Sequence, residues 1–514
     1  MAIELIREAF RVEELKGNEE LQVLVETELY LTSGKPDIEN LLWIKGKVDI
    51  LNTRIIEDKL LVSGIIKFTV VYQGGEEEDN IYTVETTKDF KEEILIQGIN
   101  EGMSSRVKSN IEFIESELEE NKVNLRAVIN LQGLVEEIKT VEIIKEINGK
   151  PELQTLTQRV GYKEVYGRES SYIEVMDTIK VDMDKPNIEK VLKFSVVTRE
   201  IESMVVEDRI ILSGDATVNM IYYGEGQISS LKETIPFNHF IEIPGAMREG
   251  KKHVELEVVQ GLYEVMEDEL GELKVVEIDL KILASGKAYE EKFKDLTVDA
   301  YSTKENVVLE RESISLIENI EEFWNKELVT MEIEDIDTKE IYDIEARANI
   351  IEKTYSDEDV KIEVIISLDI YYLDRISDEP RFYSGEFPYK SYIKVDILEE
   401  NVELELDHKL DYINYDLRKD GIDILCNVEH NLRINKERTV YGIKEIVETG
   451  EIINKKDKPS IIIYIVQKGD ILWDIAKRYN TTMEEILLSN KILNGEDIKV
   501  GDKIIIEKKI DFTL

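Results

Sequence analysis

The feature that most constrains this chain is an internal repeat with a period of 150 residues. When the 514-residue sequence is compared with itself at that shift, residues 35–42 match 185–192 and residues 57–64 match 207–214. A third, more diverged copy is expected within residues 300–432. A period of this length is too long for the unit of a solenoid, so we expect each copy to be a domain with its own hydrophobic core.

Within each copy, apolar residues recur at every second position, for example over residues 60–70 and 254–258. Such alternation is typical of strands with one buried and one polar face, and these strands pack as antiparallel sandwiches or barrels. Helices are considered only for residues 101–120 and 316–325. The repeats are therefore predicted to be mainly β, as tandem antiparallel sandwich-like or barrel-like domains. Matching tyrosines, expected to pack in the cores, are Tyr72, Tyr222 and Tyr372.

The C-terminal residues follow a different pattern. Residues 461–466 form a β-branched run, and the apolar residues of 472–479 recur at helical spacing. Thr482 with Glu485 three residues later is a capping box, which indicates the start of a second helix. Residues 503–507 are expected to form a last strand. A small α+β module in the order strand, helix, helix, strand (βααβ) is therefore predicted.

These patterns divide the chain into successive segments. The linker is placed where the apolar alternation weakens and a Lys-Lys-Asp-Lys-Pro run appears. The predicted segments are a first repeat at 1–150, a second at 151–299, a diverged third at 300–432, a linker at 433–459 and the C-terminal module at 460–510.

The charge is strongly negative, with 110 acidic and 65 basic residues and a formal net charge of −45. Nucleic acid is therefore excluded as an expected partner, because phosphate binding depends on Lys and Arg. Residues 461–510 hold eight acidic and eight basic residues. The net negative charge thus belongs to the repeats.

The single cysteine, Cys426, excludes an internal disulfide framework and fits a reducing compartment. Charged residues interrupt the apolar residues of the N-terminus at once, so no secretory signal peptide is expected. No apolar run approaches the roughly 20 residues that a transmembrane helix needs. A cytoplasmic location is therefore expected.

No catalytic or metal-binding motif stands out. The histidines, His239, His253, His408 and His430, have no partner at metal-ligand spacing. Phosphate loops, dinucleotide loops and the Gly-x-Ser-x-Gly motif are missing. We therefore predict a protein that is not an enzyme, with no catalytic residue, no metal and no cofactor.

In order and spacing, the C-terminal module resembles the LysM domain through both expected helices and both strands. The resemblance implies binding of N-acetylglucosamine-containing glycans such as peptidoglycan, by the loops after the first strand and after the second helix. However, Ile471 stands where most glycan-binding members have Thr or Ser, and an aliphatic side chain cannot hydrogen-bond a sugar. The residues that a glycan would contact are Gly469, Asp470, Ile471, Leu472, Asn490, Ile492, Leu493 and Asn494.

Acidic, β-rich tandem repeats followed by one LysM module resemble the SipL-like family of spore-coat assembly proteins, in which SPOCS repeats precede a LysM domain. The resemblance covers nearly the whole chain. It implies a scaffold in the mother-cell cytosol at the forespore surface. It also implies a partner, the spore-coat morphogenetic ATPase called stage IV sporulation protein A.

Trp473 is the candidate contact residue of the LysM-like module. It is turned about 100° from Leu472 in the buried stripe of the first helix, so it lies at the edge of that stripe. Lys477, four residues on, shares its face. Either Trp473 packs over the module's own strands and Lys477 is solvated, or both contact a partner. The residues expected to contact a protein partner are Trp473, Lys477, Asp474 and Ile471. Asp474 and Arg478 are also expected to pair along the helix.

Two functions follow from this sequence. The first is a non-enzymatic scaffold of the spore coat or envelope that docks through its LysM-like module onto the morphogenetic ATPase, and that contacts other coat proteins as well. The alternative is a peptidoglycan-binding protein anchored to the cortex or cell wall. A hydrolase would need a catalytic domain among the repeats, where no nucleophile or metal motif occurs.

Overall fold

The computed structural model describes residues 4–31, 35–75, 81–119, 122–148, 150–355, 358–395, 402–454, 459–492 and 498–507. Antiparallel strands make up most of these residues, and both helices among them lie near the C-terminal end. The prediction of a mainly β protein with a small α+β module is confirmed. Within the described ranges, no helix is both long and apolar enough to cross a membrane.

The first unit is a sandwich of two sheets. Strands β2, β3 and β4 form one sheet, and β1, β6 and β5 lie side by side in the other. The inner face of β3 carries Leu60, Ile66 and Phe68, which are fully buried because every second residue of the strand points into the core. Asp58, with φ of 59°, closes the hairpin between β2 and β3. The strands are β1 (Glu4–Tyr30), β2 (Asn40–Ile56), β3 (Lys59–Gln73), β4 (Ile81–Leu95), β5 (Ser104–Glu119) and β6 (Lys122–Asn148).

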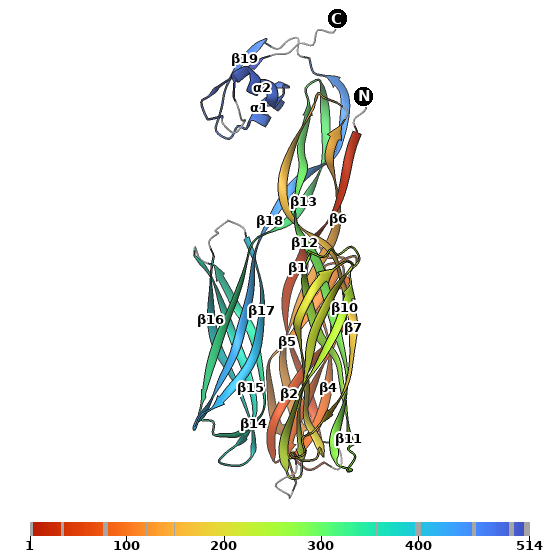
Figure 1. Cartoon of the computed structure of the whole chain (residues 1–514), viewed down its shortest axis with the longest axis vertical. Helices are drawn as coiled ribbons and strands as arrows, with labels where there is room; N and C mark the ends of the chain where they lie inside the picture. The colour runs from red at the N-terminus through yellow and green to blue at the C-terminus, as the bar shows by residue number, and fades with distance from the viewer. Residues whose placement is uncertain are drawn as a thin grey trace.

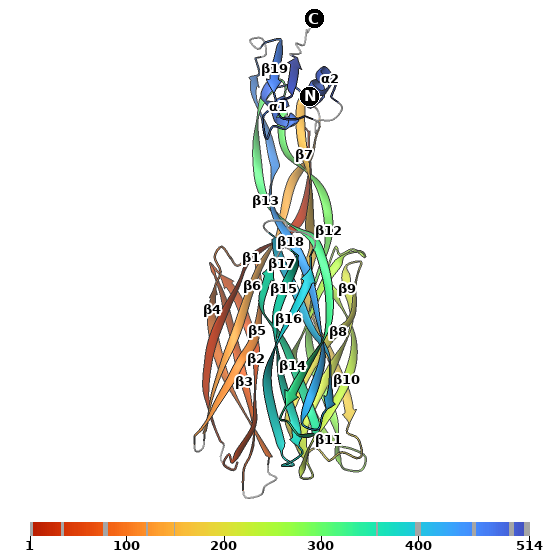
Figure 2. The ribbon, with the colours of Figure 1, turned by 90° about the vertical axis from the view of Figure 1, so that its left-hand side faces the viewer.

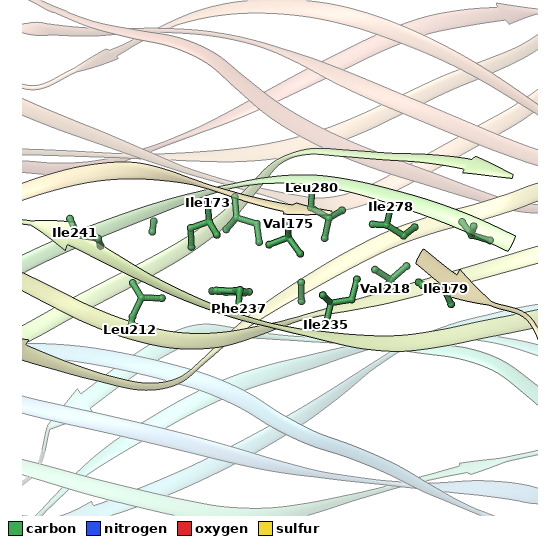
Figure 3. Close-up of a cluster of buried hydrophobic side chains, with 14 of the residues drawn as sticks. Ile173, Val175, Ile179, Leu212, Val218, Ile235, Phe237, Ile241, Ile278 and Leu280 are labelled. Atoms are coloured by element: carbon green, nitrogen blue, oxygen red, sulfur yellow. The ribbon is translucent and has the colours of Figure 1, made fainter. Parts of the chain in front are cut away.

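The second unit repeats this connectivity, with β8, β9 and β10 facing β7, β12 and β11. Figure 3 shows its core between the sheets, with Val175 and Leu280 on one side and Leu212 and Phe237 on the other. The outer strands β1 and β7 meet where Val12 pairs with Glu164, which joins the two units in one sheet. The strands are β7 (Leu153–Lys180), β8 (Lys190–Val206), β9 (Arg209–Gly224), β10 (Gln227–Glu242), β11 (Lys251–Glu267) and β12 (Leu273–Ser302).

The third unit has the same plan, with β14, β15 and β16 in one sheet and β13, β18 and β17 in the other. The matching tyrosines Tyr72, Tyr222 and Tyr372 are buried, one in each core, as expected. The strands are β13 (Glu305–Glu334), β14 (Thr338–Tyr355), β15 (Asp359–Asp374), β16 (Pro380–Lys394), β17 (Val402–Leu417) and β18 (Gly421–Ile452).

Three expectations about local structure are wrong. Residues 104–119 form β5, and 316–325 lie within β13, so neither segment is helical. Residues 433–452, expected as linker, form the second half of β18. Their alternation weakens because a bulge pairs Glu310 with Glu445 but the next residue, Arg311, with Ile443, which shifts the buried positions out of phase. Of the remaining linker, residues 455–458 lie outside the described residues.

The longest strands continue beyond the sandwiches. The first half of β1 pairs with the second half of β6, and β7 with β12 and β13 with β18 extend in the same way. Figures 1 and 2 show these three ribbons winding together into a narrow stalk above the sandwiches. The stalk has an apolar core to which all three ribbons contribute: Phe10, Val12, Val141, Ile143, Val160, Tyr162, Leu296, Ile314, Leu316 and Val440.

The three sandwiches pack around a common axis. Leu42, Leu192 and Tyr342, each 150 residues apart, lie in one apolar cluster with Val71, Ile221 and Tyr371, which are spaced in the same way. Charged residues lie beside this cluster and are paired across units. Buried Lys193 contacts Asp343 and lies 2.8 Å from Glu345, which also pairs with Lys45. The repeats therefore form one body with a shared centre in addition to their own cores.

Candidate interaction face of the C-terminal module

The C-terminal module folds as the sequence predicts. Strands β19 (Ile461–Ile465) and β20 (Lys503–Glu507) pair antiparallel, and helices α1 (Leu472–Tyr479) and α2 (Met483–Asn490) join them. The predicted capping box is present, since the Thr482 hydroxyl accepts from the Glu485 amide and the Glu485 carboxylate accepts from the Thr482 amide. Ile475, Ile486 and Ile504 are fully buried between the helices and the sheet.

Trp473 lies between this module and the stalk. Its side chain is only 3% exposed. Its ring meets Tyr301 of β12 edge to face, with centroids 4.9 Å apart, and its indole Nε1 donates a 2.8 Å hydrogen bond to Oδ2 of Asp299. The Tyr301 hydroxyl in turn donates to the carbonyl oxygen of Thr481, at 2.7 Å. The residue is therefore enclosed by groups from the second unit as well as from its own module.

Lys477 binds the same carboxylate. Its Nζ lies 2.7 Å from Oδ1 and 2.6 Å from Oδ2 of Asp299, and Arg311 from β13 donates to Oδ1 at 2.7 Å. Burial acts to raise the pKa of Asp299, but the hydrogen bonds from Lys477 and Trp473 outweigh it and hold that pKa below its ordinary value. Asp299 is thus a charged carboxylate shared by three donors at the junction of module and stalk.

The sequence identified the edge position of Trp473 but neither of its partners. Neither alternative considered for Trp473 and Lys477, packing within the module or contact with a separate partner, includes Asp299. Asp299 lies 174 residues before Trp473, and no pattern in the sequence around it indicates the contact. Asp474 is exposed, and Arg478, expected to pair with it, donates instead to the hydroxyl of Tyr464 at 3.0 Å. Ile471 is 50% exposed at the start of α1.

In the loops that resemble a glycan site, polar groups are already engaged. The Asp470 carboxylate accepts from the Tyr464 hydroxyl at 2.6 Å and from the Gln467 amide at 2.8 Å. The Asn490 side chain bonds the backbone of Ile486 and Ile505. Leu472 is buried, Gly469 has a positive φ of 92° and Ile492 is half-buried. Leu493 and Asn494 lie outside the described residues.

The sheet of the module has an apolar outer face. Ile462 and Tyr464 of β19 point toward the helices, so Ile461, Ile463 and Ile465 point away from them, and Ile463 is 64% exposed. Ile505 of β20, also exposed, pairs directly with Ile463. A continuous isoleucine run in a sheet that is covered on one side must expose every second residue. The isoleucine run is therefore the signal in the sequence that marks this face.

Two histidines of the body, His239 and His430, make contacts with neighbouring side chains. His430 is fully buried in the third core and stacks on Tyr389 with the ring planes 5° apart. The His239 ring is hydrogen-bonded to Ser171 at 2.8 Å. Among the described residues, no group of three or more His, Cys, Asp and Glu is placed to hold a metal ion.

Comparison with known protein families agrees with this architecture. Residues 37–119 and 187–266 match the family model described as SipL, SPOCS domain, and residues 464–507 match the LysM domain. No curated protein and no solved structure matches the chain. The two SPOCS matches fall in the first and second sandwich units, and the third unit repeats their strand connectivity.

The fold and these matches define a protein built from β-sandwich repeats that ends in a binding module. More particularly, it carries tandem SPOCS domains and a C-terminal LysM domain, as the sequence predicted, and this combination relates it to the sporulation coat. SPOCS and LysM domains are binding domains rather than catalytic ones, and a LysM domain binds either glycan or protein partners.

Proposed function

We propose that this protein is a non-enzymatic scaffold of spore-coat or envelope assembly that docks through its LysM module onto the coat morphogenetic ATPase, stage IV sporulation protein A. The docking would occur in the mother-cell cytosol at the forespore surface. The observation that carries the proposal is the aliphatic outer face of the module, formed by Ile461, Ile463, Ile465 and Ile505.

This outer face has the chemistry of a protein contact rather than of a sugar site. Its four isoleucines offer apolar surface and no side-chain hydrogen-bond donor or acceptor. Contiguous exposed apolar surface on a water-soluble domain commonly marks an interaction site. Lys503 and Glu507, the pairing partners of Ile465 and Ile461, flank the face with one charge of each sign, so a partner surface with an apolar centre and a polar rim would fit it.

The experiment replaces one isoleucine at the centre of the face. Ile463→Glu should reduce capture of the purified ATPase by at least about tenfold, since burying an unpaired carboxylate at the centre of an interface costs about 2 kcal/mol or more. Leu488→Glu is the matched control, because Leu488 is equally exposed but lies on α2. Equal losses for the two variants, or no loss for Ile463→Glu, would contradict docking through this face.

Glycan binding is the competing function, supported by the LysM match. It requires loop residues such as Gly469 and Ile471 to contact N-acetylglucosamine through groups that are not already engaged. Titration of the full chain with a chito-oligosaccharide separates the two proposals. Saturable binding below millimolar sugar, unaffected by Ile463→Glu, would favour the wall-anchoring function.

A further inference from the structure

The contact between α1 and the stalk has the features of a recognition site that is occupied by the protein's own chain. We propose that the face formed by Trp473, Lys477 and Thr481 binds an extended segment that presents a carboxylate and a tyrosine ring two residues apart. In the structure, Asp299 and Tyr301 of β12 occupy it. This inference does not depend on which face the ATPase contacts.

Each part of the segment meets a matching group. The carboxylate of Asp299 receives one indole hydrogen bond and both contacts of the Lys477 ammonium. The ring of Tyr301 packs edge to face on Trp473, and its hydroxyl reaches the Thr481 carbonyl. Trp473 thus contacts both the carboxylate and the ring, Lys477 contacts the carboxylate, and the Thr481 carbonyl accepts from the hydroxyl. The face therefore selects a segment by its sequence and not by apolar area alone.

Most of the residues in the module's apolar cluster come from the module itself. Val466, Ile475, Ile486 and Ile504 are buried among the module's own elements. The described stalk residues that join its apolar cluster are Tyr301 and, partly buried, Leu156. The contact combines one aromatic pair with hydrogen bonds to a charged carboxylate, and this polar character is found at interfaces between domains that move relative to each other. The stalk segment can therefore be exchanged for another of the same chemistry.

Covalent connection favours the occupant already present. Only eight residues of sequence separate β18 from β19, and covalent linkage over so short a distance along the chain gives an effective concentration in the millimolar range. A free segment must compete with the stalk segment at that effective concentration. In the wild-type chain, only a segment of high affinity can therefore displace the stalk segment. In a chain that lacks the stalk carboxylate, a segment of low affinity can bind as well.

The experiment uses the full chain and a peptide with the sequence of residues 295–303, which contains Asp299 and Tyr301. Binding is followed by the fluorescence of Trp473 in a Trp324→Phe background. That background removes the tryptophan that is 73% exposed and leaves Trp43, which is buried at the axis. The full chain used to bind the peptide carries Asp299→Asn, a substitution that keeps the volume of the side chain and removes its charge.

We expect saturable binding of the peptide to the Asp299→Asn chain and binding at least about tenfold weaker to the chain with Asp299. A peptide with Asn in place of its second Asp should not bind, and neither should the wild-type peptide to a chain that also carries Lys477→Glu. Equal affinity of the peptide for the Asp299→Asn chain and the chain with Asp299 would overturn the proposal. So would the absence of binding to the Asp299→Asn chain.

Acrylamide quenching provides a readout that needs no peptide. Opening of the contact should increase quenching of Trp473 in Asp299→Asn relative to the chain with Asp299. If quenching is unchanged although the variant retains its β-sheet circular dichroism, the stalk segment is a fixed part of the module's packing. That result would also overturn the proposal.

Discussion

Two lysines of this protein bind carboxylates from another part of the chain, and they do so in different surroundings. At the axis, the Lys193 side chain is 3% exposed and contacts Asp343 and Glu345. At the tip, the Lys477 side chain is 39% exposed and contacts Asp299. Breaking a buried pair leaves a charge away from water, whereas a partly exposed pair can be replaced by solvent. We therefore expect the first contact to hold the three units together and the second to open.

The largest effect is expected at the axis. Lys193→Met would leave the carboxylates of Asp343 and Glu345 without their main counter-charge in a buried site, so unfolding should become easier by about 3–5 kcal/mol. Denaturation in urea, followed by circular dichroism, measures the change. Lys47→Met is the matched control, since Lys47 pairs with Asp49 at the surface and should change stability by no more than about 0.5 kcal/mol. Similar losses for both variants would show that burial adds nothing to the contribution of the Lys193 pair.

The three cores offer a second comparison, because His430 stands in the third core where the second has Leu280, 150 residues earlier. Burial and the neighbouring His408 lower the pKa of His430, while the carboxylate of Glu327 acts in the opposite direction. The folded-state pKa of His430 lies below the unfolded value. The contribution of the neutral imidazole to folding stability is therefore fully present above about pH 6.5 and decreases as the pH falls through the folded-state pKa.

Replacing His430 tests this titration. The decrease should approach about 1.4 kcal/mol per pH unit for one proton, measured as the denaturation midpoint between pH 7.5 and pH 5. His430→Leu should flatten this part of the profile. If the wild type and His430→Leu lose stability in parallel over this interval, the titrating group lies elsewhere.

The smallest effect on stability is expected at the tip. In Lys477→Met, Asp299 keeps its hydrogen bonds from Trp473 and Arg311, so the free energy of unfolding should change by less than about 1 kcal/mol. The same variant should bind the peptide of residues 295–303 more weakly in an Asp299→Asn background. A loss of stability as large as that of Lys193→Met would show that the tip contact belongs to the cooperative body.

What the sequence predicted depended on local patterns. Alternation over β3, with Leu60 and Phe68 buried, and the capping box of Thr482 each specify structure within a few residues. The stalk could not be predicted from such patterns, because its strands carry bulges and its core combines residues from three units. The same holds for the tip, where Lys477 meets a carboxylate 178 residues away. Contacts between distant segments leave no period in the sequence.

The stalk strands are continuous with the sandwich strands, and this determines how a pull on the LysM module reaches the rest of the molecule. β18 has 32 residues, which at roughly 3.3 Å per residue gives an element of about 100 Å. Tension along that direction loads the hydrogen bonds of the β13–β18 ribbon in shear, so many bonds must break together. We therefore expect the continuous strands to keep a partner bound to the LysM module at a fixed distance from the sandwiches when that partner is pulled.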